Sequence, residues 1–281
     1  MNPDSEPGGP IGVFDSGVGG LTVLRALERH LPRDAFLYVG DTARVPWGTK
    51  GPDTVQRYSV RVARHLVDSG CRAIVIACNT ASAFALEAVR AAVSVPVIDV
   101  ITPVAVEVAR ALAAPPASAR HVAVLGTRGT VASHAYPRAL AAIDNTLITH
   151  QRPCPLFVPL VEEGWVDGAV PEAIARTYLD PLLRENSPDA LILGCTHYPM
   201  MSAVIARVAR AILGRDVPLF ESGDATANAL AELLGAPSPD TRPVAPSARL
   251  QVTDSPELFL DIASRFLGRP VDTVEHIDLA G

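Results

Sequence analysis

The sequence predicts an α/β protein built on parallel β-sheets. Two observations carry this prediction: short apolar runs alternate with helical patterns along almost the whole chain, and these runs are continuous rather than interrupted at every second residue. Continuous apolar runs are typical of parallel strands that helices cover on both faces. With 281 residues, of which 48% are hydrophobic, the chain can bury one large core or two smaller ones.

The first hundred residues alternate regularly between the two patterns. The expected strands lie at 11–14, 35–39, 73–77 and 97–101. The expected helices are a leucine stripe at 21–27, an apolar face at 55–66 that Ser69 and Gly70 terminate, and residues 80–93. The alternation of strand and helix favours a parallel sheet over an antiparallel one.

The pattern restarts after a stretch of small residues at 113–118. Further strands are expected at 121–125, 147–150, 190–194 and 217–220, and further helices at 131–142, 171–183 and 199–213. A proline-rich stretch at 236–247 is expected to be an exposed loop before a final strand and helix. The polar lead-in at 1–10 lacks the basic start and apolar core of a signal peptide and is expected to be frayed.

The composition excludes several classes of partner. The net charge is −6, no basic run is present and aromatic residues make up only 5%, which argues against a nucleic-acid partner. No apolar stretch approaches the length of a membrane span, so no membrane partner is expected. A cytoplasmic, reducing compartment follows, in which the four cysteines stay as free thiols; their spacing matches neither a disulfide framework nor a zinc knuckle.

Two of the cysteines stand in a repeated context. The segment Ala-Ile-Val-Ile-Ala-Cys-Asn-Thr at 73–80 is similar to Ala-Leu-Ile-Leu-Gly-Cys-Thr-His at 190–197, and a weaker pair relates 13–17 to 124–128. Each copy of the first pair is an apolar strand, a cysteine and the start of a helix. Two similar halves that face each other would place Cys78 and Cys195 on opposite sides of a cleft.

This position gives both thiols a reason to do chemistry. Parallel sheets bind ligands at the carboxyl ends of their strands, and a thiol at a helix N-terminus is expected to have a pKa lowered toward neutrality. Such a thiol can take or give a proton. A single cysteine is more often a buried small hydrophobe, and Cys71 and Cys154 keep that interpretation.

The neighbouring polar residues have ordinary interpretations as well. His197 could be a satisfied polar residue, and Asp15 could be a turn residue. The glycines at 17, 19 and 20 fit neither dinucleotide nor P-loop spacing, so we expect them to let the backbone approach a small anion such as a carboxylate. A zinc site from Cys78, Cys195 and His197 lacks the usual ligand spacing and is disfavoured.

Five segments in order resemble one known family. They are Gly-Val-Phe-Asp-Ser-Gly-Val-Gly-Gly-Leu-Thr-Val at 12–23, Gly-Asp-Thr-Ala-Arg-Val-Pro-Trp-Gly at 40–48, Ala-Cys-Asn-Thr-Ala at 77–81, Cys-Pro-Leu-Phe-Val-Pro-Leu-Val-Glu at 154–162 and Leu-Gly-Cys-Thr-His-Tyr-Pro at 193–199. Together they resemble glutamate racemases, within the aspartate/glutamate racemase superfamily. The resemblance implies an isomerase that uses no PLP, metal or nucleotide, supplies D-glutamate for peptidoglycan, and is often a homodimer.

The resemblance also implies a domain organisation and residue roles. Two similar α/β domains related by pseudo-two-fold symmetry, at 1–101 plus 216–281 and at 102–215, would enclose glutamate in the cleft between them. Cys78 would act on the D-glutamate side with help from Asp15. Cys195 would act on the L-glutamate side with help from His197 and from Glu162, with the adjacent Glu163 as the alternative match.

A set of polar and backbone groups is implied to bind the substrate. The implied ligands are Asp15, Ser16, Pro46, Trp47, Gly48, Asn79, Thr80, Thr127, Thr130 and Thr196. The family usually carries tyrosine where this chain has Trp47, and the indole keeps an aromatic wall and an N–H donor but lacks the hydroxyl acceptor.

Other functions stay open on the residues alone. PLP chemistry needs a Schiff-base lysine, and the only lysine, Lys50, lies in a loop flanked by glycine and proline. The nearest alternative is an aspartate racemase or a related two-cysteine racemase. A hydrolase with a single cysteine nucleophile and a non-catalytic amino-acid-binding module are alternatives from other classes.

Overall fold

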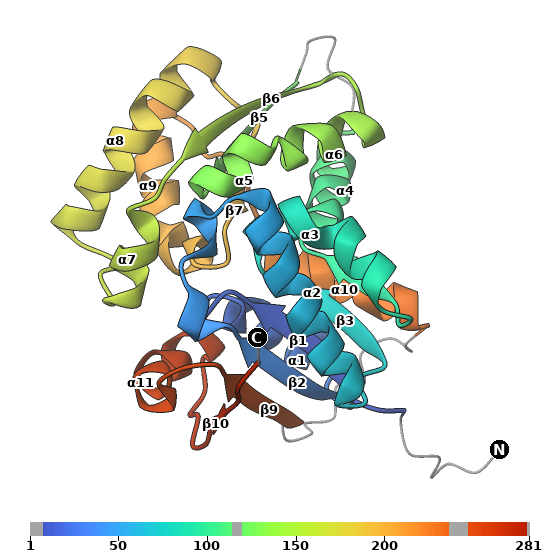
Figure 1. Cartoon of the computed structure of the whole chain (residues 1–281). Helices are drawn as coiled ribbons and strands as arrows, with labels where there is room; N and C mark the ends of the chain where they lie inside the picture. The colour runs from blue at the N-terminus through green and yellow to red at the C-terminus, as the bar shows by residue number, and fades with distance from the viewer. Residues whose placement is uncertain (1–7, 114–119, 236–246, 280–281) are drawn as a thin grey trace.

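The protein is an α/β structure with two parallel sheets, as the sequence predicts (Figure 1). The computed structural model describes residues 8–113, 120–235 and 247–279. Most of the expected lead-in, most of the small-residue stretch and the proline-rich stretch up to residue 246 lie outside the described residues. No helix in the described ranges has both the length and the apolar character needed to cross a bilayer.

The larger sheet has six strands. Their order is β10 (Glu275–His276), β9 (Ser247–Val252), β2 (Ala35–Gly40), β1 (Ile11–Asp15), β3 (Ala73–Ile76) and β4 (Val97–Asp99), and all neighbours are parallel. Alternate side chains of β1 enter different apolar clusters: Ile11 and Val13 pack on the side of α1 (Leu21–His30), and Phe14 on the side of α2 (Pro52–Asp68). Because both faces are covered, the strands are apolar throughout.

The smaller sheet repeats this construction with four strands. Their order is β6 (Leu147–Pro153), β5 (Arg120–Gly126), β7 (Ala190–Gly194) and β8 (Leu219–Glu221), again all parallel. Its helices are α4 (Thr102–Ala111), α5 (Arg128–Ser133), α6 (Ala135–Ile143), α7 (Phe157–Glu162), α8 (Ala169–Asn186) and α9 (Ser202–Leu213). Apolar residues of α4 and α6 cover one face, and those of α8 and α9 cover the other.

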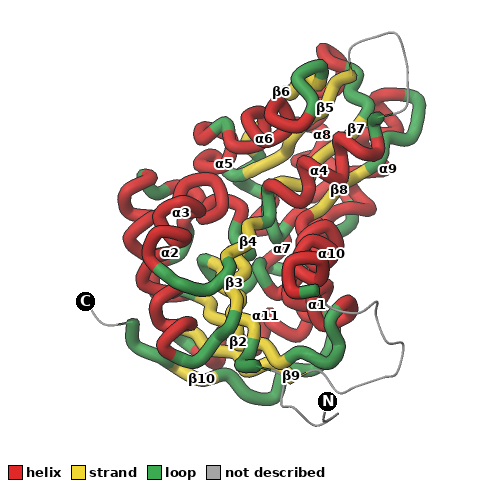
Figure 2. Tube along the Cα trace, turned by 90° about the vertical axis from the view of Figure 1, so that its right-hand side faces the viewer, coloured by secondary structure: helices red, strands yellow, loops and turns green. Residues whose placement is uncertain are grey.

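The two sheets share one continuous apolar cluster. It contains residues of β1 and α1 together with residues of β7, α8 and α9. Helix α10 (Ser222–Leu234) packs against both α1 and α4, and Figure 2 shows it beside α1. Strand β8 belongs to the smaller sheet, and the chain rejoins the larger sheet at β9. The domain boundaries near residues 101 and 216 stay a prediction.

Several elements differ from the sequence-based expectation. The strand expected at 97–101 ends at Asp99, whose carboxylate accepts the backbone N–H groups of Ile101 and Thr102 and so opens α4. The helix expected at 131–142 is divided into α5 and α6 at His134, which has a φ of 53°. Helices α4, α7 and α10 and the short strand β10 were not expected. The remaining helices, α3 (Asn79–Ala92) and α11 (Pro256–Leu267), match expected ones.

Candidate active site

A cavity of about 350 Å³ lies between the carboxyl edges of the two sheets. Its walls come from loops that follow β1, β2 and β3 of the larger sheet and β5, β6 and β7 of the smaller one. The sequence-predicted residues that line it are Asp15, Ser16, Pro46, Trp47, Gly48, Cys78, Asn79, Thr80, Thr127, Glu162, Cys195, Thr196 and His197. Residues far apart in sequence therefore converge on one small space, at the edge where parallel sheets bind ligands.

Cys78 forms the wall on the side of the larger sheet. It is the N-cap residue of α3, as predicted, and its sulfur lies 3.8 Å from the hydroxyl of Ser16. The prediction of a lowered pKa is wrong for this thiol. Burial is the main cause that raises its pKa, and the negative charge of Asp15 adds to it, so the pKa of Cys78 reaches about 12. Desolvation outweighs the helix N-terminus here.

Cys195 forms the opposite wall and heads a chain of three polar groups. Its sulfur lies 3.9 Å from Nδ1 of His197, whose Nε2 lies 3.0 Å from Oε1 of Glu162. Burial by itself would lower the pKa of His197, but its hydrogen bonds with Cys195 and Glu162 raise that pKa to about 10. His197 is therefore an imidazolium at neutral pH, held between two groups that can carry negative charge.

One detail of this side departs from the sequence-based expectation. Cys195 does not directly precede a helix, since a 3₁₀ turn begins only at Tyr198 and α9 at Ser202. The contact with His197 is made by Glu162, the residue that the resemblance implies, and not by the alternative Glu163, which is the C-cap residue of α7. The polar group beside this sulfur is thus the His197 ring rather than a helix N-terminus.

The other two cysteines lie away from the cavity. Cys71 and Cys154 are buried and unpaired, and burial raises the pKa of both thiols, that of Cys71 to about 11. They fit the interpretation as small buried hydrophobes. Within the described ranges, no three His, Cys, Asp or Glu side chains are grouped to hold a metal ion.

Three threonine hydroxyls form a triangle that joins the two sheets. Thr80, at the start of α3, lies 3.0 Å from Thr127 and 3.3 Å from Thr130, and these two lie 3.0 Å from each other. Thr127 is also the N-cap of α5, where its hydroxyl accepts the backbone N–H of Thr130. Thr130 is buried behind the other two and does not line the cavity.

Three buried polar atoms of cavity residues have no hydrogen-bond partner in the described structure. They are Oδ1 of Asp15, Oδ1 of Asn79 and Nε1 of Trp47. The second oxygen of Asp15 accepts the N–H of Gly17, and the amide nitrogen of Asn79 donates to Tyr136 and Ser222. Leaving buried polar groups unpaired is costly, so these atoms are candidates to meet complementary groups of a ligand.

The glycine-rich loop after β1 makes room for side chains. A Cβ on Gly19 would overlap with the Thr196 hydroxyl and the His197 ring, and one on Gly20 would lie 3.0 Å from the hydroxyl of Tyr38. We expected these glycines to let the backbone approach a small anion. Gly19 allows the loop of one sheet to approach the cysteine-bearing loop of the other, and the approach of an anion stays a prediction.

Sequence reasoning did not find every lining residue. The cavity also contacts Thr49 and Arg128, together with Pro155, Val158 and Pro159 from the segment that leads into α7. Arg128 is the only arginine or lysine among the described residues that line it, and its side chain is exposed. Its place directly after Thr127, at the first position of α5, is a signal that could have indicated it.

Comparisons with known proteins agree with this site. The family model "Asp/Glu/Hydantoin racemase" matches residues 11–230. The chain is similar to the glutamate racemases of Geobacter metallireducens, at 46% identity over 96% of both chains, and of Koribacter versatilis, at 43% identity over 96% of this chain and 98% of the relative. The crystal structure of Francisella tularensis glutamate racemase in complex with D-glutamate superimposes with a TM-score of 0.85 at 36% identity, covering 97% of this chain and 98% of that one.

These matches span nearly the whole chain and both sheets. The resemblance to glutamate racemases is confirmed, and so is the fold that it implies. The chain belongs to the Asp/Glu/hydantoin racemase family.

Proposed function

We propose that this protein interconverts L-glutamate and D-glutamate without a cofactor, and so supplies D-glutamate for peptidoglycan synthesis. One observation supports this function best: Cys78 and Cys195, from different sheets, line the same small cavity. Racemisation removes the α-proton from one face of the substrate and returns a proton to the other face. Two thiols on opposite walls can do this without any rotation of the substrate.

The groups around the two thiols suit one direction of the reaction. The imidazolium of His197 can donate to the Cys195 sulfur and stabilise a thiolate there, while the raised pKa of Cys78 keeps that group a thiol. Cys195 then takes the α-proton of L-glutamate, and Cys78 delivers a proton to the opposite face. The products are D-glutamate, a Cys195 thiol and a Cys78 thiolate, and the reverse reaction exchanges the two roles.

The charge on the intermediate is the main energetic difficulty. Without a cofactor to accept the electron pair, preorganised donors and exclusion of water must stabilise the carbanion. The hydroxyls of Thr80, Thr127 and Thr196 are candidate donors to the substrate carboxylate. The unpaired Oδ1 of Asp15 is a candidate acceptor for the substrate ammonium group.

The similarity to known relatives supports glutamate rather than aspartate as the substrate. The relatives at 43% and 46% identity are glutamate racemases, and the similar structure from Francisella tularensis holds D-glutamate. We also propose the homodimer and the cytoplasmic location that the resemblance implies. Light scattering after size exclusion tests the dimer.

A cysteine hydrolase would use the site differently. A single nucleophile needs one base and an oxyanion site, and it leaves a second thiol on the opposite wall without a task. The symmetric placement of Cys78 and Cys195 therefore favours proton transfer over acyl transfer.

Turnover of D-glutamate and of D-aspartate, without added PLP or metal, tests the proposed function. We expect kcat/KM to be at least about a hundredfold higher for D-glutamate, the upper range for one methylene of fit. Faster turnover of D-aspartate would contradict the substrate assignment. Absence of racemisation with both substrates would contradict the function.

A further inference from the structure

One sequence motif has charged residues that the proposed mechanism does not use. The segment at 40–48 supplies Pro46, Trp47 and Gly48 to the cavity, but its first part carries Asp41 and Arg44, which do not line it. Asp41 is fully buried and Arg44 is largely buried. Burying two charged groups is expensive unless they are paired and serve a purpose in the fold or the site.

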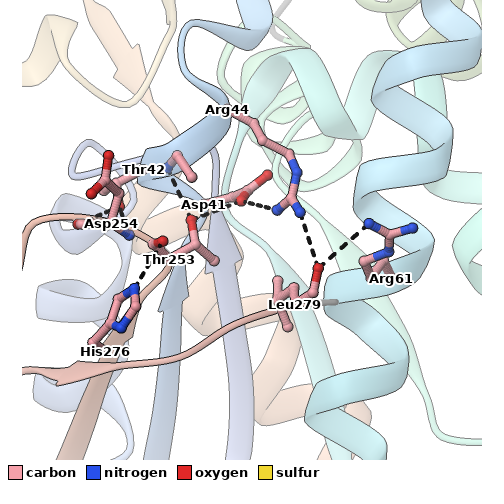
Figure 3. A network of polar contacts seen from close by, with 9 residues as sticks. Asp41, Thr42, Arg44, Arg61, Thr253, Asp254, His276 and Leu279 are labelled. Atoms are coloured by element: carbon pink, nitrogen blue, oxygen red, sulfur yellow. Dashed lines mark hydrogen bonds and ion pairs between the residues drawn. The ribbon is translucent and has the colours of Figure 1, made fainter. Parts of the chain in front are cut away.

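Arg44 bonds two distant parts of the chain with the two arms of its guanidinium group. Nη1 donates to Oδ1 of Asp41 at 2.7 Å, and Nη2 donates to the backbone carbonyl of Leu279 at 3.0 Å (Figure 3). The same Asp41 oxygen accepts the hydroxyl of Thr253 at 2.9 Å, and that hydroxyl accepts the N–H of Ala43 at 2.9 Å. The loop after β2 is thus fixed to the end of β9 and to the carboxy-terminal segment.

From Arg44 the contacts continue to the cavity wall. Its guanidinium carbon lies 5.3 Å from the ring centroid of Tyr58, and that ring lies 5.8 Å from the ring of Trp47. Trp47 is buried and lines the cavity. The side chain of Leu279 is buried in the same apolar cluster as Trp47. A cation above Tyr58 and an apolar anchor beside it both hold the indole in place.

We propose that Arg44 is a positioning residue that couples the carboxy-terminal segment at 277–279 to the substrate wall at Trp47. The planar fork of an arginine guanidinium suits two acceptors at once. The segment's contribution to substrate binding then passes through Arg44. This inference rests on the proposed function, because the wall matters only if the cavity takes an amino acid.

The kinetic test compares Arg44→Met with a matched control, Arg61→Met. Arg61 donates to the same Leu279 carbonyl at 3.5 Å but has no polar contact with the loop at 41–48 (Figure 3). For Arg44→Met we expect KM for glutamate to rise about tenfold, below the hundredfold that a displacement of about 1 Å can cost, with a smaller change in kcat. Arg61→Met should keep KM within about twofold, and it should lose less stability than Arg44→Met because it leaves no buried charge unpaired.

A pair of truncations tests whether the segment at 277–279 acts on Trp47 through Arg44. A chain that stops after His276 should reproduce the rise in KM, whereas one that stops after Leu279 should not. In the chain that stops after His276, Arg44→Met should raise KM no further, because the truncation and the substitution break the same connection. Additive effects, or an unchanged KM in either single variant, would overturn the coupling.

Tryptophan fluorescence reports on the surroundings of Trp47 without any turnover of substrate. Trp47 and Trp165 are the only tryptophans, so Trp165→Phe leaves Trp47 as the sole emitter. In that background we expect Arg44→Met to shift the emission to the red and to increase iodide quenching, and Arg61→Met to leave both unchanged. Unchanged Trp47 emission in Arg44→Met refutes the proposal even if the glutamate assignment fails. If Arg44→Met does not fold, Arg44→Lys, which can reach only one acceptor well, must show the same effects in weaker form.

Discussion

Replacing Glu162 with glutamine removes the negative charge beside His197 and keeps the side-chain volume. In the native site, Oε1 of Glu162 lies 3.0 Å from Nε2 of His197 and helps to raise the pKa of that imidazole to about 10. A hydrogen bond between charged groups is worth about 1.5–3 kcal/mol. The lower end applies here, since the Glu162 side chain is 42% exposed and water screens the pair.

This energy sets the size of the expected effect. One pKa unit corresponds to about 1.4 kcal/mol, so the pKa of His197 should fall by about one unit in Glu162→Gln. The alkaline limb of the kcat/KM profile should move to lower pH by the same amount, so kcat/KM should change little at pH 8 and should fall about fivefold at pH 10. Because the two enantiomers are equal in free energy, kcat/KM must fall equally in both directions.

The adjacent carboxylate offers a matched control. Glu163 makes no side-chain contact with His197, so Glu163→Gln should keep the native pH profile and the native kcat/KM. Circular dichroism of L-glutamate and D-glutamate solutions between pH 6 and pH 10 follows both variants. Equal profiles for the two variants would refute the assignment of Glu162 as the partner of His197.

Three further outcomes follow from the same geometry. Gly19→Ala should lose at least about a hundredfold in kcat/KM, because its Cβ overlaps with Thr196 and His197 and displaces reacting groups. The control Gly51→Ala, whose Cβ would lie in open space, should stay active. Equal activities of the two variants would contradict the close approach at Gly19. Arg128→Gln should raise KM for the anionic substrate about threefold to tenfold at low salt and less at high salt, and a salt-independent KM would exclude steering by this charge. The raised pKa of His197 stabilises the folded state fully below pH 6.5, and this contribution is lost as the pH rises toward 10; the melting temperature should therefore fall over this range more steeply than in His197→Gln, and parallel curves would argue against an imidazolium.

The strands were predictable because a strand that is buried on both faces needs a continuous run of apolar residues. The run at 73–77 is apolar on both faces, and both faces of β3 are covered in the structure. The helices that were missed lack such a signal. Where α4 begins, the carboxylate of Asp99 accepts the backbone N–H groups of Ile101 and Thr102, and a side-chain contact of this kind is hard to recognise from composition. The division at His134 depends on one residue in the left-handed region.

The site was predictable in its members but not in its electrostatics. The repeat around Cys78 and Cys195 places both thiols at strand ends, where the cavity lies. The sequence shows that Cys78 starts a helix, but it does not show how completely the thiol is buried or how close Asp15 lies. These two effects raise the pKa of Cys78 and outweigh the helix terminus.

The carboxylate partner of His197 was predicted by resemblance rather than by pattern. Glu162 is 35 residues from His197, and no local spacing joins them. The tie from Arg44 to Leu279 spans 235 residues and left no signal beyond the motif at 40–48. Contacts between distant segments depend on how the sheets pack, and such packing is the part of a structure that is hardest to predict from a single sequence.

Proton exchange at Cα in heavy water tests the two-thiol mechanism most directly. Wild type, Cys78→Ser, Cys195→Ser and the control Cys71→Ser are incubated with L-glutamate without added cofactor, and deuterium is followed in both enantiomers. In the wild type and the control, we expect the D-glutamate formed first to carry deuterium while the remaining L-glutamate keeps its proton. Each active-site serine variant should lose at least about a hundredfold in racemisation, the effect of removing a positioned acid or base. Full racemisation by either variant, or D-glutamate that retains the substrate's own proton, would contradict the mechanism.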